Sequence, residues 1–305
     1  MKLKILSSGK QEKGTIDLPM QFSEKFEPDL IKRAVLATLA NKRQRYGVDP
    51  RAGKKQEAKL SKRRRKYKGV YGHGISRTPR KIMSRSGTQF RWKGAFAPQT
   101  VGGRKSHPPK AEKIWAQKIN KKERRKAIRS AISATLMKSI VAQRGHLIPE
   151  NYPFAADSRI ESISKTGELL KAVENLGFEK ELERTNNKKI RAGKGKNRGR
   201  KYAKVRGMLV VVSENCPSII SSNNIPGLEF VEVRKLSAEM LAPGAAAGRM
   251  TVFTDRAIAL IEKDRLFTDN QVKKEKPEAK EEKPKKKPAV KTEAKPKKKL
   301  RNKNG

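Results

Sequence analysis

Apolar residues along this chain alternate between the spacing of strands and the spacing of helices, except in a few long polar stretches. Short apolar runs predict strands at residues 2–6, 15–18, 208–212, 228–233 and 250–253. Helical spacing predicts helices at residues 29–45, 121–142 and 166–176, and a last one that Thr254 or Asp255 caps and that ends near Lys263. This alternation is typical of an α/β fold with three layers, a mostly parallel sheet and helices on both faces.

The predicted helix at residues 121–142 has two different faces. Ala127, Ala131 and their apolar neighbours fall within one arc, which we expect to pack against the sheet. Three cations project from the opposite side, where we expect them to meet phosphate: Lys122, Lys126 and Arg129.

The net charge of the chain changes the picture, because 75 Lys and Arg oppose 30 Asp and Glu among 305 residues, a balance of +45. Such a charge predicts a polyanionic partner. Three segments carry most of it: residues 42–110 (+20), 186–206 (+10) and 273–305 (+10). We therefore predict a single globular domain at 1–265, a long extended basic loop at 42–110, a second basic loop at 186–206 and a disordered tail at 266–305.

The long loop is too poor in large aliphatic residues to form a core, but its composition suits RNA. Nine of the chain's 22 glycines fall here, and arginines alternate with aromatic rings that can stack on unpaired bases. A solvated basic linker is the alternative, although the arginines, the rings and the position inside the domain favour an ordered RNA-bound loop. The predicted RNA-binding residues are Arg63, Arg64, Arg65, Lys66, Arg80, Arg85, Arg91, Trp92, Lys93, Arg104, Lys105 and His107.

The second basic loop resembles a nucleotide-binding loop only superficially. Glycines and lysines alternate in it, but no glycine stands five residues before a Gly-Lys-Ser or Gly-Lys-Thr, and no acidic residue is present to hold magnesium. A glycine-rich RNA contact is the better interpretation. It would use Lys194, Lys196, Arg198, Arg200 and Lys201.

Residues 273–305 contain lysine, proline, glutamate and alanine with almost nothing to bury, which is typical of disorder. The runs 285–287 and 297–299 resemble nuclear-import patches. In so basic a chain, a non-specific electrostatic contact is the preferred interpretation.

Neither catalysis nor a metal site is predicted. Cys216 is the only cysteine, and the three histidines lie far apart without a positioned nucleophile, so we expect no enzyme, cofactor or metal site and no small-molecule substrate. Trp115 is expected to pack at a helix start. A single cysteine excludes a disulfide framework and indicates a reducing compartment, so we expect a cytoplasmic location. The N-terminal residues become polar at Ser7 and no apolar run approaches the length of a membrane span, so we expect neither secretion nor membrane contact.

Several motifs resemble the large-subunit ribosomal protein L four family in its archaeal and eukaryotic form, and most closely the archaeal form. They are VGGRKSHPPK at 101–110, INKKER at 119–124, RSA at 129–131, KGKNRGRKY at 194–202, LAPG at 241–244, GR at 248–249 and FT at 253–254. The resemblance covers about residues 1–265. The sequence departs from the family pattern at residues 81–92 and in the tail.

This resemblance implies a structural constituent of the large ribosomal subunit that binds and stabilises large-subunit rRNA. The implied partners are that rRNA, neighbouring large-subunit proteins and, at the loop tip, the nascent polypeptide. Matching by order places the tip, which would help to form the constriction of the peptide exit tunnel, at Gly72, His73, Gly74 and Arg77.

Two other functions remain as alternatives: general compaction of nucleic acid, and an enzyme on a nucleotide-binding α/β fold. Compaction requires only phosphate contacts, and the affinity of such contacts falls steeply as the salt concentration rises. Base stacking and a fit to the shape of a folded RNA, which a ribosomal protein would use, persist at high salt. The enzyme alternative lacks a recognisable site.

Overall fold

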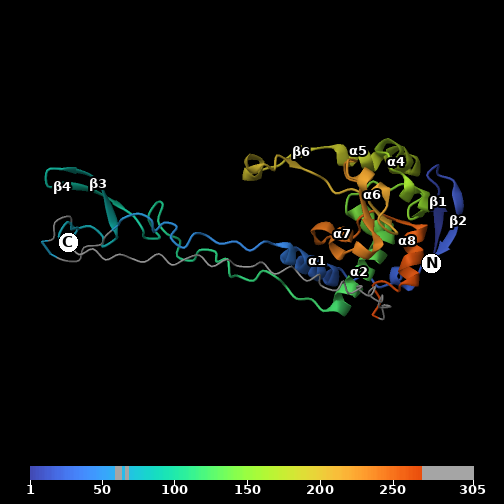
Figure 1. Cartoon of the computed structure of the whole chain (residues 1–305), viewed down its shortest axis with the longest axis horizontal. Coiled ribbons are helices and arrows are strands. Elements are labelled where there is room, and N and C mark those ends of the chain that lie inside the picture. Colours follow the sequence, from blue (N-terminus) through green and yellow to red (C-terminus); the bar gives the residue numbers. More distant parts are fainter. Residues whose placement is uncertain (59–63, 66–68, 270–305) are drawn as a thin grey trace, which may run out of the picture. The chain divides into compact units, whose positions relative to one another are not determined.

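The computed structural model describes residues 1–58, 64–65 and 69–269. Its centre is a six-stranded sheet with the strand order β2-β1-β5-β10-β8-β9 (Figure 1). The strands are β1 (Lys2–Leu6), β2 (Glu12–Asp17), β5 (Ala155–Ala156), β8 (Leu209–Val212), β9 (Glu229–Glu232) and β10 (Thr251–Thr254). The pairing of β1 with β2 is antiparallel and the other pairings are parallel, so the sheet is mixed and the predicted α/β class is confirmed.

Side chains of the sheet enter two hydrophobic cores, one on each face. Along β8, Leu209 and Val211 belong to the first core, whereas Val210 and Val212 belong to the second. This alternation follows from the two-residue period of a strand. Because β8 is buried on both faces, its sequence is one continuous apolar run.

Helices cover both faces. The first core receives side chains from α1 (Pro28–Lys42), α2 (Lys121–Leu136), α7 (Ala238–Leu241) and α8 (Asp255–Lys263). The second receives them from α3 (Lys138–Gln143), α4 (Thr166–Val173), α5 (Glu179–Asn186) and α6 (Pro217–Ser222). The Thr254 hydroxyl accepts a hydrogen bond from the Ala257 amide at 3.2 Å, which confirms the predicted cap of the last helix.

The single helix predicted at residues 121–142 is wrong, because the structure divides it into α2 and α3. The backbone of Met137 is extended (φ −83°, ψ 102°). The hydroxyl of buried Tyr152 donates to the carbonyl of Thr135, which therefore has a partner from outside the helix at the point where the chain turns. The break takes the chain from the first core to the second, where Val141 packs.

Residues 43–120, which we call the insertion, connect α1 to α2. They form the hairpin of β3 (Arg80–Ser86) and β4 (Gln89–Gly94), and none of their described residues pairs with the central sheet. Val70, Ala95 and Ala97 are buried within the insertion itself. Among the described residues of this range, Ile119 is the one that packs against a core of the domain.

The C-terminal end of the described chain remains close to the domain core. Phe267 is 7% exposed and belongs to the first core. The tail predicted from residue 266 lies outside the described residues from residue 270 onward.

A buried carboxylate, that of Glu161, joins the carboxyl ends of β8 and β10. The amide and hydroxyl of Ser213 donate to it at 3.0 and 2.6 Å, and the Thr254 hydroxyl donates at 2.6 Å. The Cys216 thiol is the most distant donor, with its sulfur 3.6 Å away. Burial and the neighbouring Glu161 raise the pKa of Cys216, which fits the interpretation of this cysteine as an unreactive small residue.

Replacing Glu161 by alanine should lower the free energy of unfolding by about 3 kcal/mol, because it leaves several buried donors without an acceptor, at about 1–3 kcal/mol each. Urea unfolding followed by circular dichroism measures this. The exposed Glu168 on α4 provides the control, since its change to alanine should shift stability by less than about 0.5 kcal/mol. Equal losses in both variants would contradict the importance of this carboxylate.

Deletion of residues 71–97, closed by a short Gly-Ser linker, should leave the domain folded. The described residues of this range contribute nothing to the two cores. We expect the urea-unfolding free energy to change by less than about 1 kcal/mol, whereas Phe253→Ala in the first core should remove about 3–5 kcal/mol. An unfolded deletion variant would show that the insertion supports the domain.

Candidate nucleic-acid interface

The insertion begins and ends at a cluster of stacked side chains. The rings of Tyr46 and Trp115 have centroids 5.7 Å apart and planes 13° apart. The Arg43 guanidinium carbon lies 3.7 Å from the Trp115 ring centroid, and its Nη2 donates to the Tyr46 hydroxyl at 3.0 Å. The expectation for Trp115 is therefore corrected: it lies on the returning side of the insertion, away from any helix start, because α2 begins only at Lys121.

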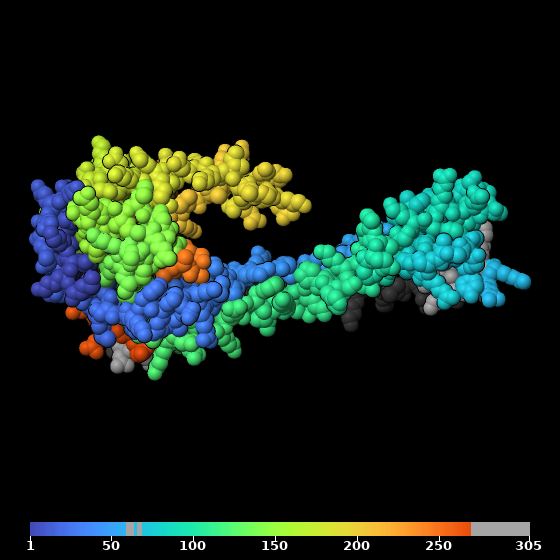
Figure 2. All heavy atoms as spheres, turned by 180° about the vertical axis from the view of Figure 1, so that it is seen from behind, coloured from blue at the N-terminus to red at the C-terminus, as the bar shows by residue number. Residues whose placement is uncertain are grey.

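The outgoing and returning sides of the insertion run side by side, as Figures 1 and 2 show in blue and green. The Val48 amide donates to the Pro109 carbonyl at 3.3 Å. Gly53 has a left-handed backbone (φ +72°), and a β-carbon there would lie 2.6 Å from the Cα of Arg104. A β-carbon at Gly103 would lie even closer to the carbonyl oxygen of Ala97. The Gly-Gly-Arg motif thus allows two backbones to approach each other.

The β3–β4 hairpin has two different faces. Directly opposed residues share a face, and the register pairs Ile82 with Trp92 and Lys81 with Lys93. Phe90 and Trp92, whose ring centroids are 6.0 Å apart, are half-buried on one face. Exposed Arg91 and Lys93 lie on the other. One face of the hairpin therefore carries the two rings, with Arg85 opposite Phe90, and the other carries Lys81, Arg91 and Lys93.

Rings and cations also meet around the predicted tip. The guanidinium carbons of Arg64 and Arg77 lie 5.6 and 5.7 Å from the Tyr71 ring centroid. His73 lies against Trp92, with centroids 5.2 Å apart. The structure thus brings the tip and the hairpin together. The predicted residues Arg63 and Lys66 lie outside the described residues.

Other predicted residues of the insertion differ in their exposure. Arg80 is half-buried and donates to Ser76, with Nη2 2.8 Å from the serine hydroxyl. The Arg85 guanidinium donates to the Gly87 carbonyl at 2.7 Å and lies 5.8 Å from the Phe90 ring centroid. Lys105 and His107 are exposed, whereas Arg104 is half-buried.

The second basic segment, residues 186–206, is a hairpin of its own. It is closed by β6 (Lys189–Ile190) and β7 (Tyr202–Ala203), and the Arg191 amide donates to the Lys201 carbonyl at 2.8 Å. All five cations predicted here are exposed: Lys194, Lys196, Arg198, Arg200 and Lys201. Figure 2 shows this segment in yellow. Phosphate can therefore reach every predicted contact of this loop.

The three cations predicted on α2 are not equivalent. Lys122 is exposed. Lys126 forms an ion pair with Glu27 at 2.8 Å, which raises its pKa. Arg129 pairs with Glu24 at 2.7 Å and donates to the Phe267 carbonyl at 2.6 Å, with only 12% of its side chain exposed. The periodicity correctly placed these side chains away from the core, but segments distant in sequence cover Arg129. RNA binding by these three residues stays a prediction.

Buried charges that sequence reasoning missed hold both ends of the second basic segment. At one end, Glu181 accepts from Arg184 Nη2 at 2.5 Å and from the Leu147 amide at 3.1 Å, and it also forms a hydrogen bond with His146 Nδ1 at 2.7 Å. At the other end, Arg249 donates to the carbonyl of Gly207 at 2.8 Å and pairs with Glu229 at 2.8 Å. In the sequence, only the Gly-Arg motif at 248–249 had drawn attention to Arg249, and it did not indicate that this arginine would contact Gly207 and Glu229.

Burial lowers the pKa of Arg249, although the nearby Glu229 opposes this effect. Arg144 is a half-buried guanidinium, whose pKa falls to about 10 through its partial burial and the neighbouring charges of Arg249 and Arg184. It donates to the carbonyls of Pro243 (2.7 Å) and Ala246. Both arginines therefore hold loops of the domain through backbone carbonyls, although only Arg249 is fully buried.

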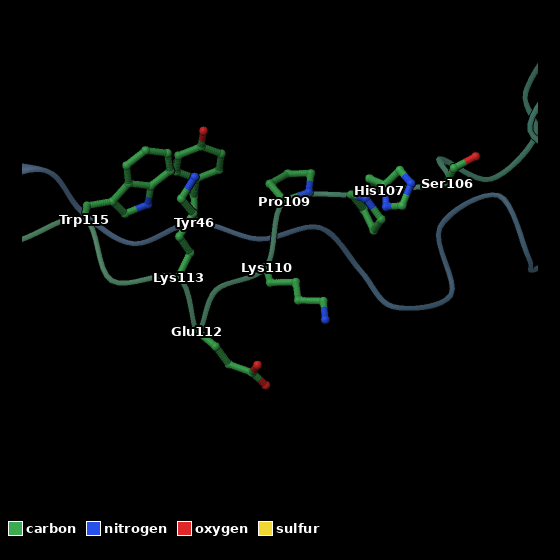
Figure 3. Close-up of a pocket in the computed structure, with 9 residues that line it drawn as sticks. Tyr46, Ser106, His107, Pro109, Lys110, Glu112, Lys113 and Trp115 are labelled. Carbon is green, nitrogen blue, oxygen red and sulfur yellow. The ribbon is translucent and has the colours of Figure 1, made fainter.

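The described residues contain no cluster suited to a metal ion. In this part of the chain, no three His, Cys, Asp or Glu side chains gather as a metal site would require. None of its helices is long and apolar enough to cross a membrane. A hollow of about 850 Å³ beside Tyr46 and Trp115 is also lined by His107, Pro109, Lys110 and Lys113 (Figure 3).

Comparison with known proteins identifies relatives over most of the chain. The model of the ribosomal protein L4/L1 family matches residues 16–264. The large ribosomal subunit protein uL4 of Nanoarchaeum equitans is 48% identical over 255 residues, covering 83% of this chain and 95% of that protein. The uL4 proteins of Methanococcus vannielii and Archaeoglobus fulgidus are 42% and 39% identical, each covering 85% of this chain and 97% of the relative.

The Glu181 cluster predicts a specific dependence of stability on pH. Burial acts to raise the pKa of Glu181, but hydrogen bonds from Arg184 and His146 outweigh this and hold it below its usual 4.5. A carboxyl group with a lowered folded-state pKa stabilises the protein above its unfolded-state pKa, and this contribution disappears as the pH falls. Glu181→Gln should therefore lower the free energy of unfolding clearly at pH 7 and much less near pH 3.

Urea unfolding at the two pH values measures this difference. The exposed Glu183 is the matched control, because its change to glutamine removes the same charge from the same helix. A stability loss in Glu181→Gln that did not vary with pH would contradict the assignment.

Proposed function

Because this chain belongs to the ribosomal protein L4/L1 family, we propose that it is a structural constituent of the large ribosomal subunit that binds and stabilises large-subunit rRNA. Its relatives bear the name of a large-subunit protein, and the family consists of ribosomal proteins, so the chain is not an enzyme. Its partners are then rRNA and neighbouring ribosomal proteins. Its location is the ribosome, and therefore the cytoplasm.

The observation that best supports RNA binding is the excess of positive charge in two segments of the chain. Residues 42–110 contain 22 cations and two acids, and residues 186–206 contain ten cations and none. Two carboxylates cannot neutralise so many cations, whereas RNA phosphates can. The proposed contacts are the residues predicted from the sequence: those from Arg63 to His107 in the insertion, those from Lys194 to Lys201 in the second basic segment, and Lys122, Lys126 and Arg129 on α2.

The two faces of the β3–β4 hairpin suggest how the insertion binds. Arg91 and Lys93 on the cationic face suit the sugar-phosphate backbone, since guanidinium groups match phosphate oxygens in geometry. Phe90 and Trp92 on the other face offer flat surfaces for unpaired bases. A hairpin of this kind would fix the junction between two RNA elements.

The tip of the insertion is proposed to reach the peptide exit tunnel and to contact the nascent polypeptide at its constriction. Gly72 and Gly74 have left-handed backbones (φ +87° and +64°), and exposed His73 and Arg77 flank the turn. A narrow turn made of glycine fits a confined channel. This assignment rests on matching the order of the family's loop elements.

Compaction of nucleic acid in general is the competing function. It needs only phosphate contacts, and it gives no reason for two stacked aromatic clusters inside the insertion. Family membership also argues against it.

The test is retention on ribosomes. The protein should migrate with large subunits through a gradient after a high-salt wash. The triple variant Lys194→Ala, Lys196→Ala, Arg198→Ala should be released at lower salt, because each lost phosphate contact reduces the slope of log affinity against log salt by roughly 0.7–0.9.

A control triple variant removes the same charge from exposed lysines of the domain: Lys2, Lys165 and Lys171, each changed to alanine. Its retention should equal that of the unaltered chain. Release of the unaltered chain at modest salt would overturn the scaffold proposal and favour non-specific binding.

A further inference from the structure

The hollow beside the stem of the insertion is bounded by flat surfaces of different chemistry. The stacked rings of Tyr46 and Trp115 form one part of its lining, and Pro109 and His107 form another (Figure 3). Its volume of about 850 Å³ is within the range of about 300–1,000 Å³ that is usual for small-ligand sites. Aromatic and proline rings are suitable surfaces for the face of a nucleobase.

One polar atom in the lining lacks a partner. The indole Nε1 of Trp115 is buried, and no described residue accepts a hydrogen bond from it. Buried donors of this kind are rare in folded proteins, so each requires an explanation. An acceptor supplied by a ligand in the hollow would satisfy it.

The charges around the hollow favour an anion. The Lys113 ammonium lies 4.3 Å from the Trp115 ring centroid, and Arg43 covers the same ring. Lys110 also lines the hollow, but Figure 3 shows its ammonium on the other side of the backbone from the rings. The Glu112 carboxylate, which also lines the hollow, lies on that same side, so Lys113 and Arg43 are the cations beside the rings.

We propose that this hollow holds one unstacked nucleotide of single-stranded RNA. Its base lies between the Tyr46–Trp115 rings and the Pro109–His107 wall, and its phosphate meets Lys113. The exposed Lys113 side chain moves from the ring to the phosphate, and the indole N–H of Trp115 then donates to the nucleotide. The site would lock the two sides of the insertion together at their base. This inference rests on the proposed RNA-binding function.

Tryptophan fluorescence provides a direct test, because the chain contains only Trp92 and Trp115. In the full-length Trp92→Phe background, Trp115 is the only tryptophan. A short oligoadenylate should reduce its emission in a saturable way, whereas an abasic sugar-phosphate oligomer of equal length should leave it nearly unchanged.

Variants in the same background test the stacking surface. Tyr46→Ala should weaken the oligoadenylate response roughly 5- to 100-fold, the range expected from loss of one base-stacking contact. Ile220→Ala removes an exposed apolar side chain from α6 and should have no effect.

The possible failures are distinguishable when binding of labelled oligoadenylate is measured in parallel by anisotropy. Binding without a change in Trp115 emission, or equal quenching by the abasic oligomer, would overturn the nucleotide site but leave the RNA-binding function intact. Quenching only by an acidic peptide would assign the hollow to a protein partner. Failure of the unaltered chain to bind large-subunit rRNA would overturn the proposed function itself.

Discussion

The constraint on which the rest of the structure depends is a positive charge that the chain cannot neutralise by itself. Residues 42–110 and 186–206 together contain 32 cations and two acids. Mutual repulsion opposes packing of such segments into a core, and their partner must supply the missing negative charge. The central sheet and its helices are nearly balanced in charge outside these segments, so the domain can fold around two hydrophobic cores.

Unlike the cations of the basic segments, the buried charged side chains of the domain have partners within the chain. Hydroxyl groups surround Glu161, a guanidinium and an imidazole contact Glu181, and carbonyls together with Glu229 satisfy Arg249. A buried charge without such partners would be strongly destabilising. Two of these clusters flank the second basic segment. The domain therefore provides firm ends for a loop whose own residues are exposed.

The insertion is organised by rings and glycines in place of a core. Cations lie over Tyr71, Phe90 and Trp115, and close backbone contacts at glycine hold its two sides together. Arginine can stack on a ring while its N–H groups remain free to face other acceptors. The same side chains can thus shape the insertion and remain suitable for binding nucleic acid.

The sequence by itself determined the α/β class, the position of the strands β1, β8, β9 and β10, a helix cap at either Thr254 or Asp255 and the segments that carry the charge. These features depend on local periodicity, local capping chemistry and composition, all of which are properties of neighbouring residues. Only the tertiary structure decided that the chain breaks at Met137, that Arg129 is covered by Glu24 and Phe267, and that Tyr46 meets Trp115. Each of these depends on which distant segments meet, and the pattern along one segment contains no information about the segment that will lie against it.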